Sequence, residues 1–320
     1  MCYSAQVEED YKKFVRMYGA VMDFKTFHET YVERLRDGVR LQIPTAMDAN
    51  FMEPQSPIEQ EIKDAIFAFR AKRQTELEQE IEEQNGRLAA AEAKLAVKLT
   101  KKYENEKRVA GNRIARAQEK IKALNEPPPP PGSNRIYPLD FAAVMVKENG
   151  KRVIKPMRYH CRPAGYGTRI DADYPGLYNA RRDSLEGWWK GMFGKSHGVL
   201  IATGFYENVR RPPADGSMPD PRDQGPNIIL KFEPRTKQVM YLAALWDRTG
   251  DEKTGSFLSF AVITDEPPNE VRAAGHDRCI IPLKEKNVDA WLTPEGRSRK
   301  ELYDILDDRE RPYFEHQVVT

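Results

Sequence analysis

Apolar residues follow three successive patterns along the chain. In residues 1–50, Tyr11, Phe14 and Tyr18 recur at helical spacing, and a similar pattern covers Phe27 to Leu35. These patterns predict a pair of short amphipathic helices. Residues 51–132 carry heptad spacing, and residues 133–320 carry short apolar runs separated by turn residues. We therefore expect an N-terminal segment that folds onto a core, a helical insertion and the core itself.

The middle segment has the strongest helical signals. Ser56-Pro57-Ile58-Glu59 combines an N-cap serine, a proline at the first helical position and a glutamate placed for a capping box. Two heptad seams follow, formed by Leu77, Ile81, Leu88 and Leu95, then by Ile114, Ala117, Ile121 and Leu124. We predict a long helix or an antiparallel hairpin packed as a coiled coil. Asn85-Gly86 and Gly111-Asn112 are the expected breaks, and the prolines at 127–131 form a stiff linker.

The last segment is rich in strand patterns. Two apolar stretches flank Glu148-Asn149-Gly150, which predicts a β-hairpin. Further strands are expected at 199–202, 227–232, 239–245 and 257–264, and short helices near 184–192, 270–274 and 288–292. The Pro-, Gly- and Asp-rich stretch 210–226 predicts a mobile loop. The fold class is thus α+β, a strand-rich core with a long helical insertion.

Charge and cysteine content narrow the function classes. The net charge of +2 excludes a globally basic nucleic-acid-binding protein, so any DNA contact needs a local patch. Three cysteines favour a reducing compartment over a disulfide framework. No signal peptide and no apolar run of about 20 residues is present, which predicts a cytoplasmic protein without membrane contact.

Cys2 offers distinctive chemistry if Met1 is removed, because one residue then carries both a thiol and an α-amine. The amine has a reference pKa of about 8, against about 10.4 for lysine, so more of it is the free base near neutrality. An aldehyde condenses with such an aminothiol to a Schiff base, and thiol attack then closes a thiazolidine ring. By itself, however, Cys2 is better explained as a small residue that merely permits removal of Met1.

Three motifs downstream of Cys2 change this balance. They are Tyr178-Asn179-Ala180-Arg181, Gly204-Phe205-Tyr206-Glu207 and Gly275-His276-Asp277-Arg278. Together with Cys2, in this order, they resemble the SOS-response-associated peptidase (SRAP) family. The segments 242–247 and 260–264 resemble the family's AGLW and FTILT strands, and 280–283 its MPVIL segment more loosely. The resemblance covers Cys2 and about 135–292, and leaves the helical insertion unexplained.

The resemblance implies a specific activity. Members of the family form a thiazolidine between the N-terminal cysteine and the ring-opened deoxyribose of an abasic site in single-stranded DNA, in DNA repair and the SOS response. By position, Cys2 would be the nucleophile, Asn179 would hold the N-terminal residue or the sugar, and Glu207 would be the general acid and base. His276 would hydrogen-bond the opened sugar. Arg181 and Arg278 would bind flanking phosphates, in a protein associated with the nucleoid.

The same chemistry requires these residue types independently. Ring opening and dehydration of a carbinolamine both need a proton donor, and a buried glutamate with a raised pKa supplies one. Arginine offers a bidentate fork for phosphate. Each residue also has a purely structural reading: Asn179 in a turn, Glu207 as a charge at a strand edge, and His276 at a helix C-terminus.

The sequence departs from the family pattern in several places. Tyr3-Ser4 replaces the usual Gly-Arg, and Asn208 stands where a tryptophan usually follows Tyr-Glu. The family's Trp-Gly-Leu-x-Pro segment survives only faintly in residues 159–163. These changes remove tryptophans where base stacking is expected, and Trp188 and Trp189 are candidate substitutes, with core packing as the alternative.

Two other function classes remain open. A cysteine peptidase would use Cys2 with Glu207 and His276, with removal of Met1 as its minimal activity. A scaffold protein would recruit a partner, or a second copy of itself, through the coiled coil and would have lost the chemistry. No cofactor is expected, and no metal either, because adjacent His160-Cys161 is a poor chelating pair and no CxxC motif exists.

Overall fold

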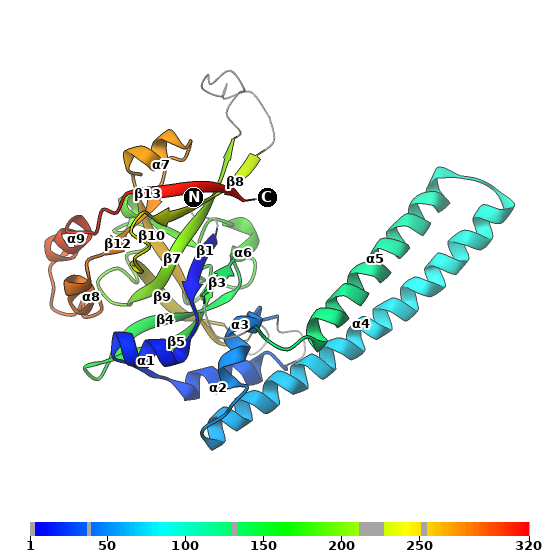
Figure 1. The fold of residues 1–320 in the computed structure, drawn as a ribbon, viewed down its shortest axis with the longest axis horizontal. Coiled ribbons are helices and arrows are strands. Elements are labelled where there is room, and N and C mark those ends of the chain that lie inside the picture. Colours follow the sequence, from blue (N-terminus) through cyan, green and yellow to red (C-terminus); the bar gives the residue numbers. More distant parts are fainter. Residues whose placement is uncertain (1–3, 37–39, 130–132, 211–226, 251–254, 320) are drawn as a thin grey trace. The chain divides into compact units, whose positions relative to one another are not determined.

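The computed structural model describes residues 4–36, 40–129, 133–210, 227–250 and 255–319. The chain divides into two compact units (Figure 1). The larger one combines residues 1–53 with 130–320, and the smaller one is the helical segment Pro54–Pro129. Residues on both sides of the helical insertion therefore fold together. Among the described helices, none combines the length and apolar composition needed to cross a bilayer.

The larger unit is built on a mixed β-sheet that closes on itself. Strand β7 pairs with β4 on one side and with β9 on the other, and the pairs β4–β5, β5–β10 and β10–β9 complete the ring. The strands are β1 Ser4–Glu8, β2 Ala20–Met22, β3 Ser133–Ile136, β4 Phe141–Glu148, β5 Lys151–Tyr159, β6 Asn179–Arg181, β7 His197–Arg210, β8 Asn227–Pro234, β9 Met240–Thr249, β10 Phe257–Asp265, β11 Cys279–Ile280, β12 Pro282–Leu283 and β13 Phe314–Val319.

The core of this unit lies inside the closed sheet. It gathers alternate residues from several strands, including Val144 of β4, Leu200 of β7, Leu242 of β9 and Phe260 of β10, each fully buried. Burial of such side chains contributes about 1.5–3 kcal/mol each. The predicted hairpin at 148–150 is confirmed, since Asn149 and Gly150 adopt φ values of 49° and 78° between β4 and β5. A two-residue turn with both φ angles positive matches the twist of the flanking strands.

Strand β7 is much longer than the four residues predicted. Its first half belongs to the closed ring, while Phe205–Arg210 pairs with β8. The opposite edge of that second half pairs with β1, which includes Ala5↔Phe205 and Ser4↔Tyr206. Neither β1 nor β13 was predicted, because both are short and their side chains gain burial only against distant strands.

Helices cover parts of the sheet. They are α1 Tyr11–Tyr18, α2 Phe24–Glu33, α3 Thr45–Asp48, η1 Ala49–Phe51, α6 Ile170–Asp173, η2 Arg182–Ser184, α7 Asn269–Ala273, α8 Glu285–Trp291 and α9 Arg299–Asp307. The predicted amphipathic pair of helices corresponds to α1 and α2. The ring centroids of Tyr11 on α1 and Phe27 on α2 lie 5.0 Å apart. The helix expected near 184–192 is instead a series of turns after η2. Most of the loop predicted at 210–226 lies outside the described residues.

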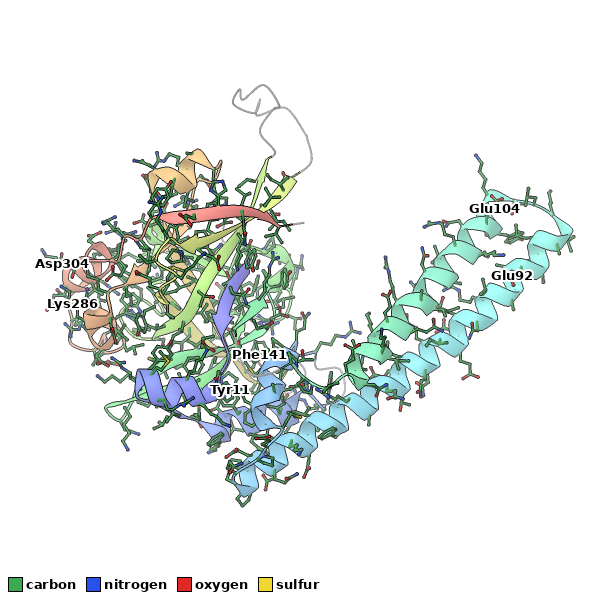
Figure 2. All side chains as sticks on the ribbon, in the orientation of Figure 1. Tyr11, Glu92, Glu104, Phe141, Lys286 and Asp304 are labelled. Carbon is green, nitrogen blue, oxygen red and sulfur yellow. The ribbon has the colours of Figure 1, made fainter. Side chains whose placement is uncertain are left out.

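The smaller unit is an antiparallel helical hairpin of α4 Pro57–Val97 and α5 Lys101–Asn125. Ser56 caps α4 as predicted, accepting a hydrogen bond from the Glu59 amide. From Leu77 onward, the buried positions recur every seven residues, at Leu77, Gln84 and Ala91 on α4 and at Ala110 and Ala117 on α5, with the partly buried Ile81, Leu88 and Ile114 between them. Lys107 and Glu92 form an ion pair of 2.8 Å across the hairpin. In Figure 2, Glu92 and Glu104 lie near the end at which the helices are connected.

The breaks predicted within the insertion are wrong. Gly86 and Gly111 both lie inside helices, and the chain reverses at residues 98–100 instead. A single interior glycine costs about 1 kcal/mol relative to alanine, which neighbouring helix-forming residues and packing readily offset. Thr100 then begins α5, accepting a hydrogen bond from the Tyr103 amide. An α+β fold with a long helical insertion is confirmed.

Candidate functional site

Glu207 and His276 form a buried pair inside the larger unit. The Nε2 atom of His276 lies 3.0 Å from Oε2 of Glu207. The Glu207 side chain is fully buried, and that of His276 is 7% exposed. Two of the predicted site residues, 69 positions apart in the sequence, are thus in direct contact.

Strand β7 places Glu207 on the interior face. Phe205 and Val209, two positions before and after it, belong to the apolar core, so the carboxyl group shares their side of the strand. Gly204 allows β8 to approach closely, since a Cβ atom at this position would lie 2.8 Å from the carbonyl oxygen of Phe232. The Gly-Phe-Tyr-Glu motif therefore combines a close strand contact with an inward-facing acid.

His276 reaches Glu207 through a glycine turn after α7. Gly275 has φ +94°, a conformation that other L-residues adopt only with strain. The turn returns the chain so that the His276 amide donates to the carbonyl of Val271 at 3.2 Å. A Cβ atom on Gly275 would lie 3.8 Å from the Cβ of Val209, which places the turn directly beside β7.

The surroundings of the pair determine where its proton lies. The Nδ1 atom of His276 is 2.9 Å from the carbonyl oxygen of Arg278, which only accepts, and 3.3 Å from the amide of Arg278. These contacts hold the ring so that its Nε2 atom faces the carboxyl group of Glu207. Burial raises the pKa of Glu207, more than the hydrogen bond with His276 lowers it. A protonated Glu207 can therefore donate to Nε2, or to a substrate in its place.

Asn179 lies in β6, a short strand that pairs in parallel with β10. It is opposite Val262 of β10 and is 6% exposed. Its neighbour Tyr178 belongs to the same core cluster as Val209 and Cys279, which flank Glu207 and His276 in the sequence. The three segments that carry Asn179, Glu207 and His276 thus pack in one core.

Comparison with known proteins identifies the family of this chain. The family model of the SOS response associated peptidase (SRAP) matches residues 90–320, a range that contains Asn179, Glu207 and His276. The chain belongs to the SRAP family. Cys2 lies outside the matched range, as do all residues before 90. A search of curated proteins finds no match.

Three solved structures are similar to this SRAP chain at low identity. A Bacteroides thetaiotaomicron protein is 15% identical, with a TM-score of 0.46, over 58% of this chain and 77% of that one. A Bordetella bronchiseptica protein is 17% identical, with a TM-score of 0.45, over 58% and 87% of the two chains. A phage-related protein from Bordetella bronchiseptica is 19% identical, with a TM-score of 0.43, over 61% and 85%.

The two arginines predicted to bind phosphate in this SRAP protein converge on one acid. The Nε atom of Arg181 donates to Oδ1 of Asp183 at 3.0 Å, and Nη2 of Arg278 lies 3.8 Å from Oδ2 of the same carboxylate. The hydrogen bond from Arg181 lowers the pKa of Asp183, so this carboxylate is ionised at neutral pH. Sequence analysis missed Asp183, although its position two residues after Arg181 is compatible with such a pair.

The first described residue, Ser4, lies beside the strand that carries Glu207. It pairs with Tyr206, and Nε of Arg135 donates to its Oγ atom at 3.0 Å. The Arg135 guanidinium lies 3.7 Å from the centroid of the Tyr206 ring, a cation–π contact. Arg135 thus attaches the beginning of β1 to β7, a role that the sequence did not indicate. Cys2 itself lies outside the described residues.

The two tryptophans considered for base stacking differ in exposure. Trp189 is 2% exposed and packs in the interior, whereas Trp188 is 37% exposed. The Trp188 ring lies 5.1 Å from that of Tyr174 and 5.9 Å from that of Tyr166. Only Trp188 is therefore accessible for a stacking contact. Among the described residues, no cluster of His, Cys, Asp and Glu side chains suits a metal ion.

Proposed function

We propose that this SRAP protein binds abasic sites in single-stranded DNA covalently, through a thiazolidine formed by Cys2 after removal of Met1. The observation that supports this most directly is the buried pair of Glu207 and His276, because Glu207 lies on β7 next to β1, the strand that follows Cys2. Ser4, at the N-terminal end of β1, pairs with Tyr206, one residue before Glu207.

The short segment between Cys2 and Ser4 limits how far Cys2 can lie from β1. Cys2 precedes Ser4 by two residues, and two residues span at most about 7 Å. The hydrogen bond from Arg135 and the pairing with Tyr206 hold Ser4 in place. Cys2 is therefore only two residues from a position held beside Tyr206, the neighbour of Glu207 in the sequence.

The reaction begins with the α-amine of Cys2 and the C1′ aldehyde of the opened deoxyribose. Protonated Glu207 donates to the ring oxygen as the sugar opens and then to the carbinolamine hydroxyl, which leaves as water. A carbon–nitrogen double bond forms in that step. The amine adds to the aldehyde carbon to give this carbinolamine. His276, whose Nε2 faces the carboxyl group, takes up the proton that the C1′ hydroxyl releases as the aldehyde forms and passes it to Glu207 for the second donation.

Ring closure completes the product. The thiol of Cys2 loses its proton and its sulfur adds to the imine carbon, while the nitrogen gains a proton. The product is a five-membered thiazolidine, and the overall loss is one water molecule. Closure is intramolecular and gains the rate advantage of reactants held in proximity. Asn179 would hold the N-terminal residue or the sugar, and Arg181 and Arg278 would bind the phosphates on either side.

The test is incubation of the purified protein with a single-stranded oligonucleotide that contains one abasic site. We expect an adduct stable on a denaturing gel, with the mass of protein without Met1 plus DNA minus one water. Cys2→Ala should abolish it, and Cys2→Ser should give only a Schiff base that requires borohydride for trapping. A heat-stable adduct from Cys2→Ser without trapping would exclude the thiazolidine.

The peptidase named in the family description is a second candidate, because it would use the same three residues. Intact mass distinguishes the two functions. A peptidase would cleave casein or a peptide without DNA and would lose this activity in Cys2→Ala. If Met1 is absent and neither cleavage nor an adduct occurs, the chain retains the fold without the chemistry, and the scaffold function is favoured.

A further inference from the structure

The distal part of the helical hairpin carries a concentration of positive charge. Residues 84–122 contain 11 lysines and arginines against four glutamates, a net charge of +7, whereas the whole chain carries +2. The rest of the protein is therefore net negative. The distal part of the hairpin, residues 84–122, is thus a local basic patch that the overall charge conceals.

Most of this charge lies on α5, at exposed positions. The helix contains eight basic and three acidic residues. Lys107 pairs with Glu92 of α4, whereas the other seven basic side chains are exposed and form no ion pair with any carboxylate of the described residues. Ala110 and Ala117 pack in the hairpin and are buried, and the seven cations occupy exposed positions of α5 around them. We call these seven exposed residues the basic stripe: Lys101, Lys102, Arg108, Arg113, Arg116, Lys120 and Lys122.

We propose that this stripe on α5 is a second DNA contact, binding the phosphate backbone independently of the lesion. This rests on the proposed function, which supplies DNA as the polyanion. A helix of 25 residues is about 37 Å long, comparable to ten base pairs of duplex. Unpaired, exposed lysines and arginines over that length match a row of phosphates, and they release counterions on binding. The hairpin then increases the affinity for DNA without reading its sequence.

A second copy of the chain is the competing occupant. Residues 76–83 of α4 contain five glutamates and no basic residue, so the basic stripe of one chain could pair with that acidic segment of another. DNA is favoured because its phosphates extend along the whole length of the stripe, whereas the acidic segment covers only eight residues. The two occupants lead to different expected results for DNA affinity and for self-association.

The experiment uses the full chain and an oligonucleotide without an abasic site, so that no covalent bond forms. The variant Arg113→Gln/Arg116→Gln/Lys120→Gln removes three charges from α5 while keeping good helix formers. The matched control, Lys12→Gln/Lys151→Gln, removes exposed charges from the larger unit at two lysines that, like the α5 cations, form no ion pair among the described residues. The conservative variant Arg113→Lys/Arg116→Lys keeps the charge and tests for a structural effect.

We expect the α5 variant to bind single-stranded DNA about 10-fold or more weakly at low salt, with the slope of log K against log salt reduced by about 2. The control and the lysine variant should retain wild-type affinity. Unchanged affinity and slope in the α5 variant would overturn the proposal. So would a loss of self-association, measured by light scattering, with DNA binding intact, since the stripe would then bind a second copy. Failure of the proposed crosslinking would appear separately, as no adduct with abasic DNA.

Discussion

The Nε2 atom of His276 lies 3.0 Å from Oε2 of Glu207, and Nδ1 of the same ring lies 2.9 Å from the carbonyl oxygen of Arg278. The imidazole thus connects a fully buried carboxyl group to the backbone of the loop that carries Arg278. This arrangement fixes the orientation of the ring. It places the buried acid on the interior face of the second half of β7 in contact with the imidazole Nε2 atom.

Replacing Glu207 with glutamine should slow crosslinking by about 100-fold or more, because the variant keeps the shape of the side chain and loses the acid. Single-turnover rates with an abasic oligonucleotide measure this effect, and the reversal of the adduct should slow in parallel. Wild-type rates in both directions would remove Glu207 from the mechanism. Noncovalent binding of intact DNA serves as the control and should not change.

The rate of crosslinking should depend on pH through Glu207. Because burial raises its pKa, Glu207 is the donor below that pKa, and the rate should decline as pH rises through it. Deprotonation of the Cys2 amine acts in the opposite direction, so we expect a bell-shaped profile. The descending limb should disappear in Glu207→Gln. A descending limb that persists in this variant would assign it to another group.

The same raised pKa predicts how Glu207 affects stability. The unfolded chain has an ordinary glutamate pKa of about 4.3, so the folded state binds the extra proton above that pH. The contribution of Glu207 to the free energy of unfolding is therefore fully present at lower pH and is lost as pH rises through the raised pKa. Denaturant unfolding at several pH values should show a weaker decline in Glu207→Gln than in the wild type.

Replacing Asp183 with asparagine should strengthen DNA binding. Arg181 and Arg278 both contact this carboxylate, which competes with phosphate for their guanidinium groups. We expect an increase of several-fold in affinity for single-stranded DNA at low salt, measured by fluorescence anisotropy. Arg181→Gln should have the opposite effect. If Asp183→Asn weakens binding instead, the acid orients the arginines rather than competing for them.

Two glycines in the hairpin offer a test of stability. A Cβ atom added to Gly86 or Gly111 would meet no other atom within 4 Å, and both residues lie in helices. Alanine at each position should therefore stabilise the hairpin by about 0.5–1 kcal/mol. Thermal unfolding followed by circular dichroism measures this change. Gly204→Ala provides the contrast. Its Cβ atom would lie 2.8 Å from the carbonyl oxygen of Phe232, so we expect this substitution to destabilise the larger unit.

The sequence by itself determined the local elements and the chemistry. Heptad spacing and the cap at Ser56 predicted the helical insertion, and Asn149-Gly150 predicted the turn between β4 and β5. The order of short motifs indicated the family and singled out Glu207 and His276. These features are readable because they depend on residue type and spacing within short segments.

Only the tertiary structure decided which residues meet. The pairing of Ser4 with Tyr206, the contact of Arg278 with Asp183 and the reversal of the hairpin near residue 99 all depend on packing between distant or competing segments. The raised pKa of Glu207 arises from burial among core residues, which no local pattern encodes. Long-range burial and pairing are collective properties of the folded chain, so one sequence supplies the groups and the fold sets their electrostatics.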